Sequence, residues 1–218
     1  MVGRTTVQYM QAGVAAFHLE DQVQTKRCGH LRNKELVDED VFLSRIKAVV
    51  NMRAQTPGDI LIIARTDALQ SLGFEAAVER LKEAVAIGAD VVFLEGITSK
   101  EEAKYLCEEL SSTPVVLNNV AGGLTPKWTV QEAKELGFKI VIYPGFALAP
   151  VYQAVAAAAK ELKEMGDLQV APGASPKGTD RLSGNLPYSI GTFNLLSYII
   201  FDEKGQTRSA QTEEFTQS

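Results

Sequence analysis

The sequence contains little cysteine, no long apolar run and no surplus of positive charge. Two cysteines in 218 residues cannot form a disulfide framework, and they favour a reducing compartment. No hydrophobic stretch reaches the roughly 20 residues of a membrane-spanning helix. The formal net charge is -5 and the pI is near 5.2, whereas proteins that bind nucleic acid or anionic membranes are usually basic. We therefore expect neither nucleic acid nor a membrane among the partners of this chain.

These absences make a cytosolic (cytoplasmic) protein the default expectation. No secretory segment follows Met1, and residues 216–218 do not form a peroxisomal tripeptide. A mitochondrial location stays open, because a transit sequence would not be seen if an N-terminal segment of the protein is missing from this chain.

Short apolar runs alternate with longer segments of helical period, which is typical of successive βα units around a parallel sheet. Each run is rich in Val, Ile or Leu, as expected for strands covered on both faces. The runs predict strands at about Ala15–Leu19, Ile60–Ala64, Asp90–Leu94, Pro114–Leu117 and Lys139–Tyr143. The intervening segments predict helices at about 38–54, 73–87, 99–110 and 129–136, and the chain opens inside a further helix.

The C-terminal part differs in composition from the rest. An alanine-rich helix is predicted at about Pro150–Met165, and residues 166–187 carry three prolines that predict a long loop. Residues 191–201 are apolar and aromatic and predict an anchoring helix. We therefore expect a catalytic α/β domain over 1–165, a loop and helical arm over 166–204, and a disordered tail over 205–218.

Polar residues follow each predicted strand at its C-terminal end. They are Glu20-Asp21, Arg65-Thr66-Asp67, Glu95, Asn118-Asn119 and Tyr143. In parallel α/β folds ligands bind at this end of the strands, so these residues predict one shared site. Several neighbours stay ambiguous: Asp21 and Asp67 are either structural or functional, Trp128 and Tyr143 line the substrate or pack, and His18 is interpreted as a core histidine.

The segment Lys26-Arg27-Cys28-Gly29-His30 concentrates reactive groups in a loop. Neighbouring positive charge favours the thiolate form of a cysteine, so Cys28 is a candidate for proton transfer. Gly29 lets the backbone approach a ligand closely. The alternative is that Cys28 is a small buried hydrophobe in a solvated basic loop.

These motifs resemble those of the isocitrate lyase and phosphoenolpyruvate mutase superfamily. The resemblance covers about residues 7–160, and its nearest branch contains 2-methylisocitrate lyase, dimethylmalate lyase, petal death protein and oxaloacetate hydrolase. It rests on Glu20-Asp21-Gln22, Lys26 to His30, Asn33-Lys34, Ala64 to Ala68, Phe93 to Gly96, and Val116-Leu117-Asn118 followed by Gly122-Gly123.

The resemblance implies a (β/α)8 TIM-type barrel whose last helix is exchanged between subunits, giving homo-oligomers such as dimers or dimers of dimers. Such a barrel has eight strands and about 250 residues, so the five predicted strands indicate an incomplete barrel. We expect about three N-terminal βα units to be missing. With them go a Ser-Gly-Gly segment and the aspartates that supply the direct magnesium ligand, and unpaired sheet edges then favour association.

By the same resemblance, the chain is a Mg²⁺-dependent (or Mn²⁺-dependent) carbon–carbon lyase or hydrolase of 2-hydroxy or 2-oxo di- or tricarboxylic acids. Cys28 matches the general acid, with Lys26 and Arg65 beside it in the catalytic set, and Glu20 matches a residue that reaches the metal. The substrate-binding set is Gly29, His30, Arg65, Glu95 and Asn118. Two alternatives are a phosphonate mutase or hydrolase, and an inactive truncated member that acts as an interaction or regulatory subunit.

Overall fold

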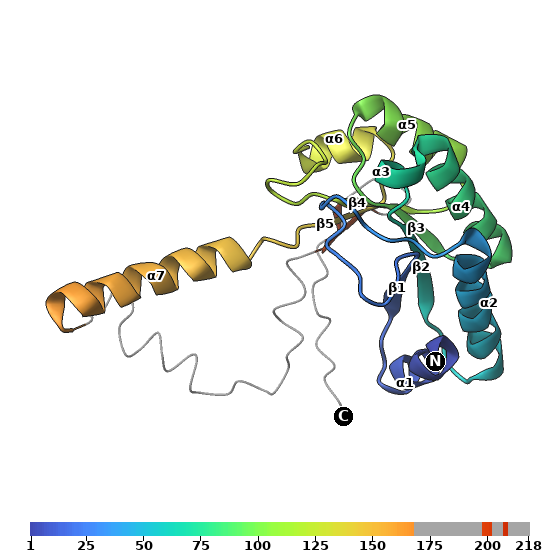
Figure 1. The fold of residues 1–218 in the computed structure, drawn as a ribbon, viewed down its shortest axis with the longest axis horizontal. Helices are drawn as coiled ribbons and strands as arrows, with labels where there is room; N and C mark the ends of the chain where they lie inside the picture. Colours follow the sequence, from blue (N-terminus) through green and yellow to red (C-terminus); the bar gives the residue numbers. More distant parts are fainter. Residues whose placement is uncertain (168–197, 202–206, 209–218) are drawn as a thin grey trace. The chain divides into compact units, whose positions relative to one another are not determined.

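A computed structural model describes residues 1–167, 198–201 and 207–208. Its centre is a curled sheet of five parallel strands, which run side by side in sequence order (Figure 1). They are β1 (Ala16–Glu20), β2 (Leu61–Thr66), β3 (Val91–Leu94), β4 (Val115–Asn118) and β5 (Ile140–Ile142). This half-barrel confirms the predicted incomplete (β/α)8 fold, and each strand begins and ends within two residues of its predicted bounds.

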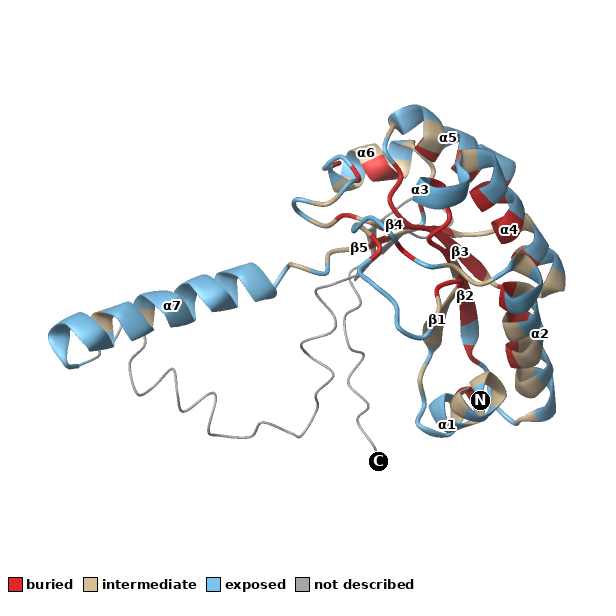
Figure 2. Ribbon diagram, viewed as in Figure 1, coloured by how far each residue is buried: buried red, intermediate tan, exposed pale blue. Residues whose placement is uncertain are grey.

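Helices cover the outer face of the sheet. They are α1 (Val2–Gln11), α2 (Glu39–Gln55), α3 (Leu69–Leu72), α4 (Phe74–Ile87), α5 (Lys100–Glu109) and α6 (Val130–Glu135). Figure 2 shows that the buried side of α2, α4 and α5 faces the strands. The short α3 is an addition to the predicted helices, because four residues are too few for a helical period to be recognised.

Local signals explain where several helices begin and end. Thr129 caps α6 in a capping box, since its side chain accepts from the Glu132 backbone N–H while the Glu132 side chain accepts from Thr129. Gly137 follows α6 with φ 104°, and a Cβ there would lie 2.8 Å from the Cβ of Cys107. Only glycine fits both demands. These signals are local in sequence, which is why the helix positions were predictable.

Alternate residues of the strands form an apolar layer on the inner face of the curl. Ile63, Val91, Phe93 and Val116 form a buried cluster, and Ala16, Ile140 and Ile142 pack against it. Because side chains alternate across a strand, the residue that follows this layer at each strand end also faces inward. The register pairs Glu20 with Arg65 across β1 and β2. The inner layer therefore places Glu20, Arg65, Glu95 and Asn118 on one face, at the carboxyl edge of the sheet.

His18 belongs to the same layer, and it makes stability depend on pH. Burial lowers its pKa to about 4, with smaller contributions from the charges of Arg65 and Lys26. An unfolded histidine titrates near 6.5, so the unfolded chain binds more protons between these values. Stability is therefore complete above about pH 6.5 and falls as the pH drops toward 4.

We expect the titration of His18 to lower the free energy of unfolding, measured in urea, by about 1–3 kcal/mol between about pH 7 and 4.5. This range is reduced to allow for the partial exposure of the side chain. The variant His18→Gln should lose that part of the pH dependence, because glutamine does not titrate. Equal pH slopes in the two proteins would contradict a buried neutral histidine.

The chain divides into two compact units, and the first unit ends at Ile142 before it resumes at 199–208. Strands β6 (Tyr198–Phe201) and β7 (Thr207–Arg208) pair antiparallel at the end of the strand order. The predicted helix over 191–201 is therefore wrong at its C-terminal end, where β6 forms instead, and residues 191–197 lie outside the described part. Apolar runs this short do not distinguish a strand from a helix.

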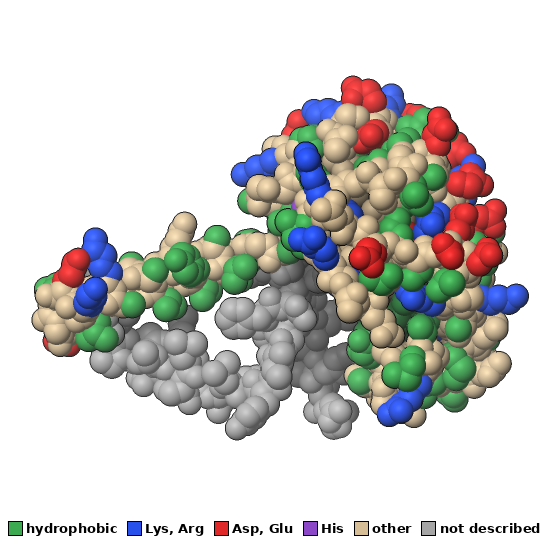
Figure 3. Space-filling view, in the orientation of Figure 1, with side chains coloured by type: hydrophobic (Ala, Val, Ile, Leu, Met, Phe, Trp, Pro, Cys, Tyr) green, Lys and Arg blue, Asp and Glu red, His purple; other side chains and the backbone are tan. Residues whose placement is uncertain are grey.

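The second unit contains α7 (Leu148–Met165), which ends at Gly166 in the left-handed conformation. None of its residues is buried, and apolar side chains such as Leu148, Tyr152 and Val155 are exposed along it (Figure 3). This helix confirms the alanine-rich helix predicted at 150–165 and begins two residues earlier. Within the described residues no helix has both the length and the apolar character needed to cross a membrane. The predicted loop at 166–187 and the tail at 205–218 fall almost entirely outside the described residues.

Candidate active site

Arg65, the inward-facing residue near the end of β2, lies at the centre of a cluster of carboxylates. Its Nε lies 2.9 Å from Asp67 Oδ2 and 3.3 Å from Glu20 Oε2. Its Nη2 lies 3.1 Å from Asp67 Oδ1 and 3.0 Å from Glu95 Oε2. The guanidinium also stacks over the Phe93 ring, 5.0 Å from its centroid. One cation therefore links the ends of three adjacent strands.

The surrounding carboxylates stabilise the positive charge of the Arg65 guanidinium. Burial by itself lowers the pKa of Arg65, but the hydrogen bonds and charge of Asp67, then the charges of Glu95 and Glu20, outweigh burial and raise it. The bidentate pairing expected for a substrate carboxylate is made to Asp67 instead. The hydrogen bonds and ion pairs given above use Nε and Nη2 of Arg65, which leaves Nη1 as a candidate donor to a ligand.

Glu95 follows β3 and is almost completely buried. Its carboxylate accepts from Asn118 Nδ2 at 3.2 and 3.3 Å and from the Gly96 backbone N–H at 3.1 Å, in addition to Arg65. This donor set fits an ionised carboxylate, which accepts hydrogen bonds at both oxygens. Asn118 Oδ1 is buried and has no hydrogen-bond partner in the described structure. The site therefore presents one unused acceptor beside Glu95.

His30 connects the cysteine loop to two other segments. Its Nδ1 accepts a hydrogen bond from the Leu124 backbone N–H at 2.9 Å. The ring hydrogen is therefore on Nε2, which lies 3.1 Å from Glu95 Oε1 and donates to it. A Cβ on Gly123 would lie 2.7 Å from His30 Nδ1, so glycine permits this approach. His30 thus joins the loop, the end of β3 and the segment around residue 124.

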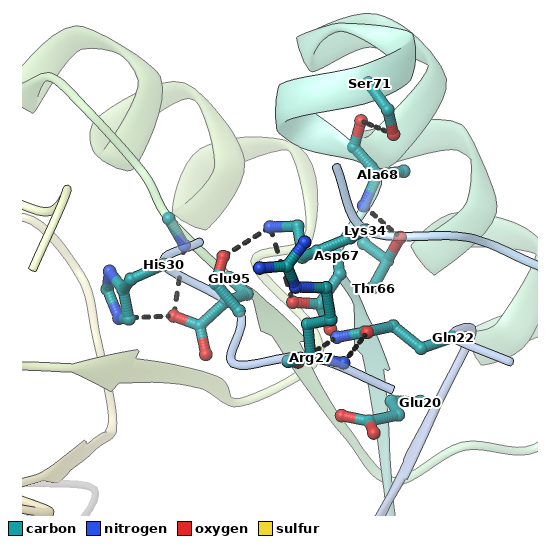
Figure 4. Close-up of polar contacts among 12 residues, drawn as sticks. Glu20, Gln22, Arg27, His30, Lys34, Thr66, Asp67, Ala68, Ser71 and Glu95 are labelled. Carbon is teal, nitrogen blue, oxygen red and sulfur yellow. Dashed lines mark hydrogen bonds and ion pairs between the residues drawn. The ribbon is translucent and has the colours of Figure 1, made fainter. Parts of the chain in front are cut away.

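The cysteine loop lies directly against the strand ends. A Cβ on Gly29 would lie 2.4 Å from Glu95 Cγ, 2.5 Å from Arg65 Nη2 and 2.6 Å from Asp67 Oδ1. Such distances are far below van der Waals contact, so only glycine fits at this position. Cys28 is exposed, and Lys26 forms an ion pair with Glu20. Figure 4 shows His30 and Glu95 facing each other beside the loop.

Asp21 is a structural residue of the network beneath the site. It is fully buried and accepts from Thr66 Oγ1 at 2.5 Å, the Asp67 backbone N–H at 2.9 Å and Arg80 Nη1 at 3.1 Å. Burial raises the pKa of Asp21, and the Asp67 and Thr66 hydrogen bonds and the charge of Arg80 oppose that effect. Arg80 also donates to the Val37 carbonyl, so α4 is tied to the segment after the cysteine loop.

The structure brings together most of the site residues predicted from sequence. They are Glu20, Lys26, Gly29, His30, Arg65, Glu95 and Asn118, and Cys28 lies exposed on the same loop. Two residues gain importance. Asp67, left ambiguous by the sequence, is fully buried and holds Arg65, and Lys34 reaches Asp67. Trp128 is buried and stacks on Phe138, which makes it a packing residue.

The described residues do not complete a magnesium site. No group of three or more potential ligands among His, Cys, Asp and Glu is placed to hold a metal in the described part of the chain. Glu20, whose side chain is 16% exposed, is the carboxylate with access to the open side of the site. A magnesium ion prefers several oxygen ligands in octahedral geometry, so Glu20 supplies at most part of the set.

A profile of the phosphoenolpyruvate phosphomutase family matches residues 1–163. The chain belongs to the PEP mutase/isocitrate lyase superfamily. Members are generally metal-dependent. The resemblance predicted from the motifs is thus confirmed, and it includes the branch: the similar proteins are named 2-methylisocitrate lyase, 2,3-dimethylmalate lyase and oxaloacetate acetylhydrolase.

Two curated members of the superfamily illustrate the similarity in sequence. The chain is 39% identical to 2-methylisocitrate lyase of Aeropyrum pernix over 165 residues, covering 76% of this chain and 52% of the relative. It is 40% identical to 2,3-dimethylmalate lyase of Eubacterium barkeri over 143 residues, covering 66% and 48%. The chain thus spans about half the length of these curated relatives.

Solved structures of the superfamily agree in fold. A crystal structure of 2,3-dimethylmalate lyase matches with TM-score 0.80 and 49% identity, covering 84% of this chain and 61% of that one. Oxaloacetate acetylhydrolase with the inhibitor 3,3-difluorooxalacetate matches with TM-score 0.77 and 41% identity, covering 86% and 67%. The phosphoenolpyruvate phosphomutase of Streptomyces platensis subsp. rosaceus shares the fold at TM-score 0.71, with 23% identity.

Proposed function

We propose that this chain carries the substrate-binding side of a carbon–carbon lyase for 2-hydroxy or 2-oxo di- or tricarboxylic acids. 2-Methylisocitrate, 2,3-dimethylmalate and oxaloacetate are candidate substrates, taken from the names of the relatives. The observation that carries the proposal is the cluster at the carboxyl edge of the sheet. There Arg65 lies within 3.3 Å of Glu20 and 3.0 Å of Glu95, and Gly29 of the cysteine loop packs on top.

The available atoms of the site suit an oxygen-rich anion. Arg65 Nη1 would donate to a substrate carboxylate, and a guanidinium is well suited to that group. Asn118 Oδ1 would accept from a hydroxyl of the substrate, which would satisfy a buried acceptor that otherwise costs free energy. Arg65 and Asn118 thus complement a molecule that has both carboxylate and hydroxyl groups.

In the proposed cleavage the carbinol loses its O–H proton to a base or to water and becomes a carbonyl, and the breaking carbon–carbon bond leaves its electron pair on a carbon beside a carboxylate. In our proposal the Cys28 thiol gives its proton to that carbon, as a general acid placed by the loop. Lys26, paired with Glu20, keeps positive charge at the same edge. The loop excludes water when Gly29 rests on Glu95, which protects the carbanion from solvent protons.

A divalent cation, Mg²⁺ or Mn²⁺, is part of the proposal, with Glu20 as one oxygen ligand. The charges of the site support it. Three carboxylates, Glu20, Asp67 and Glu95, face three cations, Lys26, Lys34 and Arg65. A dicarboxylate that enters this balanced site adds negative charge that the side chains do not compensate. A divalent cation would supply the compensating positive charge.

A lyase fits this chain better than phosphonate chemistry. The relatives named as lyases or as oxaloacetate acetylhydrolase share 39–49% identity in the comparisons above, and the phosphomutase shares 23%. The cysteine loop is also the part that touches the strand-end cluster. An interaction or regulatory role without turnover is the outcome that an activity test would reveal.

The test is to incubate the full chain and Mg²⁺ with 2-methylisocitrate, 2,3-dimethylmalate, oxaloacetate or phosphonopyruvate. Mass spectrometry then detects the products that are released. We expect turnover of at least one of the first three substrates, and loss of turnover in EDTA. Turnover of phosphonopyruvate alone would favour the mutase alternative, and no turnover with any substrate would contradict a catalytic function.

A further inference from the structure

Lys34 carries a buried ammonium group in the cysteine loop. Its side chain is 1% exposed, its Nζ donates to the Gly29 carbonyl, and it lies 3.6 Å from Asp67 Oδ1. A buried ammonium is costly unless it is paired and hydrogen-bonded. The protein therefore keeps Lys34 buried only as long as Gly29 and Asp67 stay in place around it.

The backbone before Lys34 is shaped for this contact. Asn33 has φ 58°, and it is the non-glycine residue with positive φ in the described part of the chain. Asparagine tolerates this left-handed conformation better than most residues. The Leu31 N–H donates to the Cys28 carbonyl at 2.9 Å, which forms a turn. Together these features direct the Lys34 side chain back toward Gly29, so the loop closes on itself.

The loop has few other contacts on this side. Leu31, Arg32 and Asn33 are exposed, and a groove of about 680 Å³ borders residues 32–34. Beyond Lys34 the chain is anchored again, because the Val23 N–H donates to the Glu35 carbonyl at 3.1 Å. Between these points Lys34 and His30 attach the loop to Asp67 and Glu95, and the exposed Lys26 pairs with Glu20 at the end of β1. Figure 4 places Lys34 beside Asp67.

Asp67 is shared by Lys34 and Arg65. Arg65 donates to both Asp67 oxygens, at 2.9 and 3.1 Å, and Lys34 pairs with Oδ1. The same carboxylate therefore orients the guanidinium and receives the ammonium that holds the loop. A change at Lys34 would reach Arg65 through Asp67 and Cys28 through Gly29.

We propose that Lys34 is a positioning residue that holds the segment Cys28–His30 closed over Arg65 and Glu95 through its bond to the Gly29 carbonyl. The effect of Lys34 on turnover rests on the proposed function. The effect of Lys34 on the closure of the loop does not depend on that function. Lys34 acts through Gly29 and Asp67, and its buried ammonium lies behind the loop backbone.

The test is amide hydrogen exchange of the full chain, followed by mass spectrometry of peptides that cover residues 23–36. In Lys34→Met, which keeps a long side chain without the charge, we expect exchange of this segment to become at least about 10-fold faster, because a charged hydrogen bond is lost. Peptides that cover β3 should exchange as in the parent. Lys47→Met removes an exposed lysine of α2 and serves as the matched control.

Chemical rescue separates positioning from general stability. In Lys34→Ala, added n-propylammonium, which matches the atoms removed beyond Cβ, should slow the exchange of residues 23–36 again, and tetramethylammonium, which has no N–H donor, should not. Where the parent turns over substrate, kcat should fall about 10-fold or more in both variants. It should recover with n-propylammonium in Lys34→Ala and not in Lys34→Met, whose side chain fills the space.

Parent-like exchange of the loop in Lys34→Met would overturn the proposal. Faster exchange in every peptide would also overturn it, since that result indicates a general structural role. If the parent shows no turnover, the proposed function fails, and the exchange data still decide whether Lys34 closes the loop.

Discussion

Replacing Gly29 by alanine is expected to lower kcat/KM at least about 100-fold, because displacement of a catalytic segment by about 1 Å has an effect of this size. The added Cβ would lie 2.4 Å from Glu95 Cγ and 2.5 Å from Arg65 Nη2, so the loop must move away from the strand ends. Cys28 and His30 would move with it. Steady-state kinetics with the best substrate of the panel measures the effect.

The fold should survive this substitution. The neighbouring residues 24–28 are exposed, so an open loop uncovers little apolar surface, and the unfolding midpoint should stay close to that of the parent. Gly145→Ala is the matched control, because a Cβ there meets nothing within 4 Å. Parent-like kinetics in Gly29→Ala would show that the loop does not rest on Glu95 during turnover.

Replacing Cys28 by serine is expected to lower kcat by about 10²- to 10⁴-fold, the range for loss of a general acid. A serine hydroxyl is a far weaker acid than a thiol, while its size and polarity suit the exposed position of Cys28. Thermal unfolding should therefore be unchanged. Single-turnover measurements with deuterium incorporation into the product would report the proton transfer directly.

Cys107 provides the control for this substitution. It is buried in α5, and burial raises its thiol pKa to about 12, so it does not ionise near neutral pH. Cys107→Ser should lower stability by about 1–3 kcal/mol, because it buries a hydroxyl, and should leave kcat close to the parent value. Unchanged turnover in Cys28→Ser would remove Cys28 from the role of acid.

The strands and their polar ends were predictable because their signals are local. Runs such as Ile62-Ile63-Ala64 identify a buried strand, and the alternation of side chains then places Arg65 on the same face as Ile63. The carboxyl ends of neighbouring parallel strands lie at the same edge of the sheet. Glu20, Glu95 and Asn118 were therefore predicted to lie near Arg65. No long-range information was needed for this part of the site.

The side-chain contacts of the cysteine loop could not be predicted from the sequence. Lys26 was placed in the catalytic set beside Cys28, and the sequence did not show that its ammonium pairs with Glu20. Lys34 belongs to a recognised motif, but nothing in its neighbours shows that it is buried, since lysine is almost always exposed. Such pairings depend on the path of the chain between two strands, and a path of this kind has no periodic signal. The asparagine at position 33 is a local signal that could have suggested a left-handed turn, and the structure shows φ 58° there.

The most direct test of the central claim is a calorimetric titration of the full chain with oxalate, a stable dianion, in the presence of Mg²⁺. We expect one saturable site, with binding lost in Arg65→Met and weakened in Gly29→Ala, because the strand-end cluster and the loop would bind the anion together. No saturable binding to the parent protein, or equal affinity in the parent and both variants, would contradict a shared anion site at the carboxyl edge of the sheet.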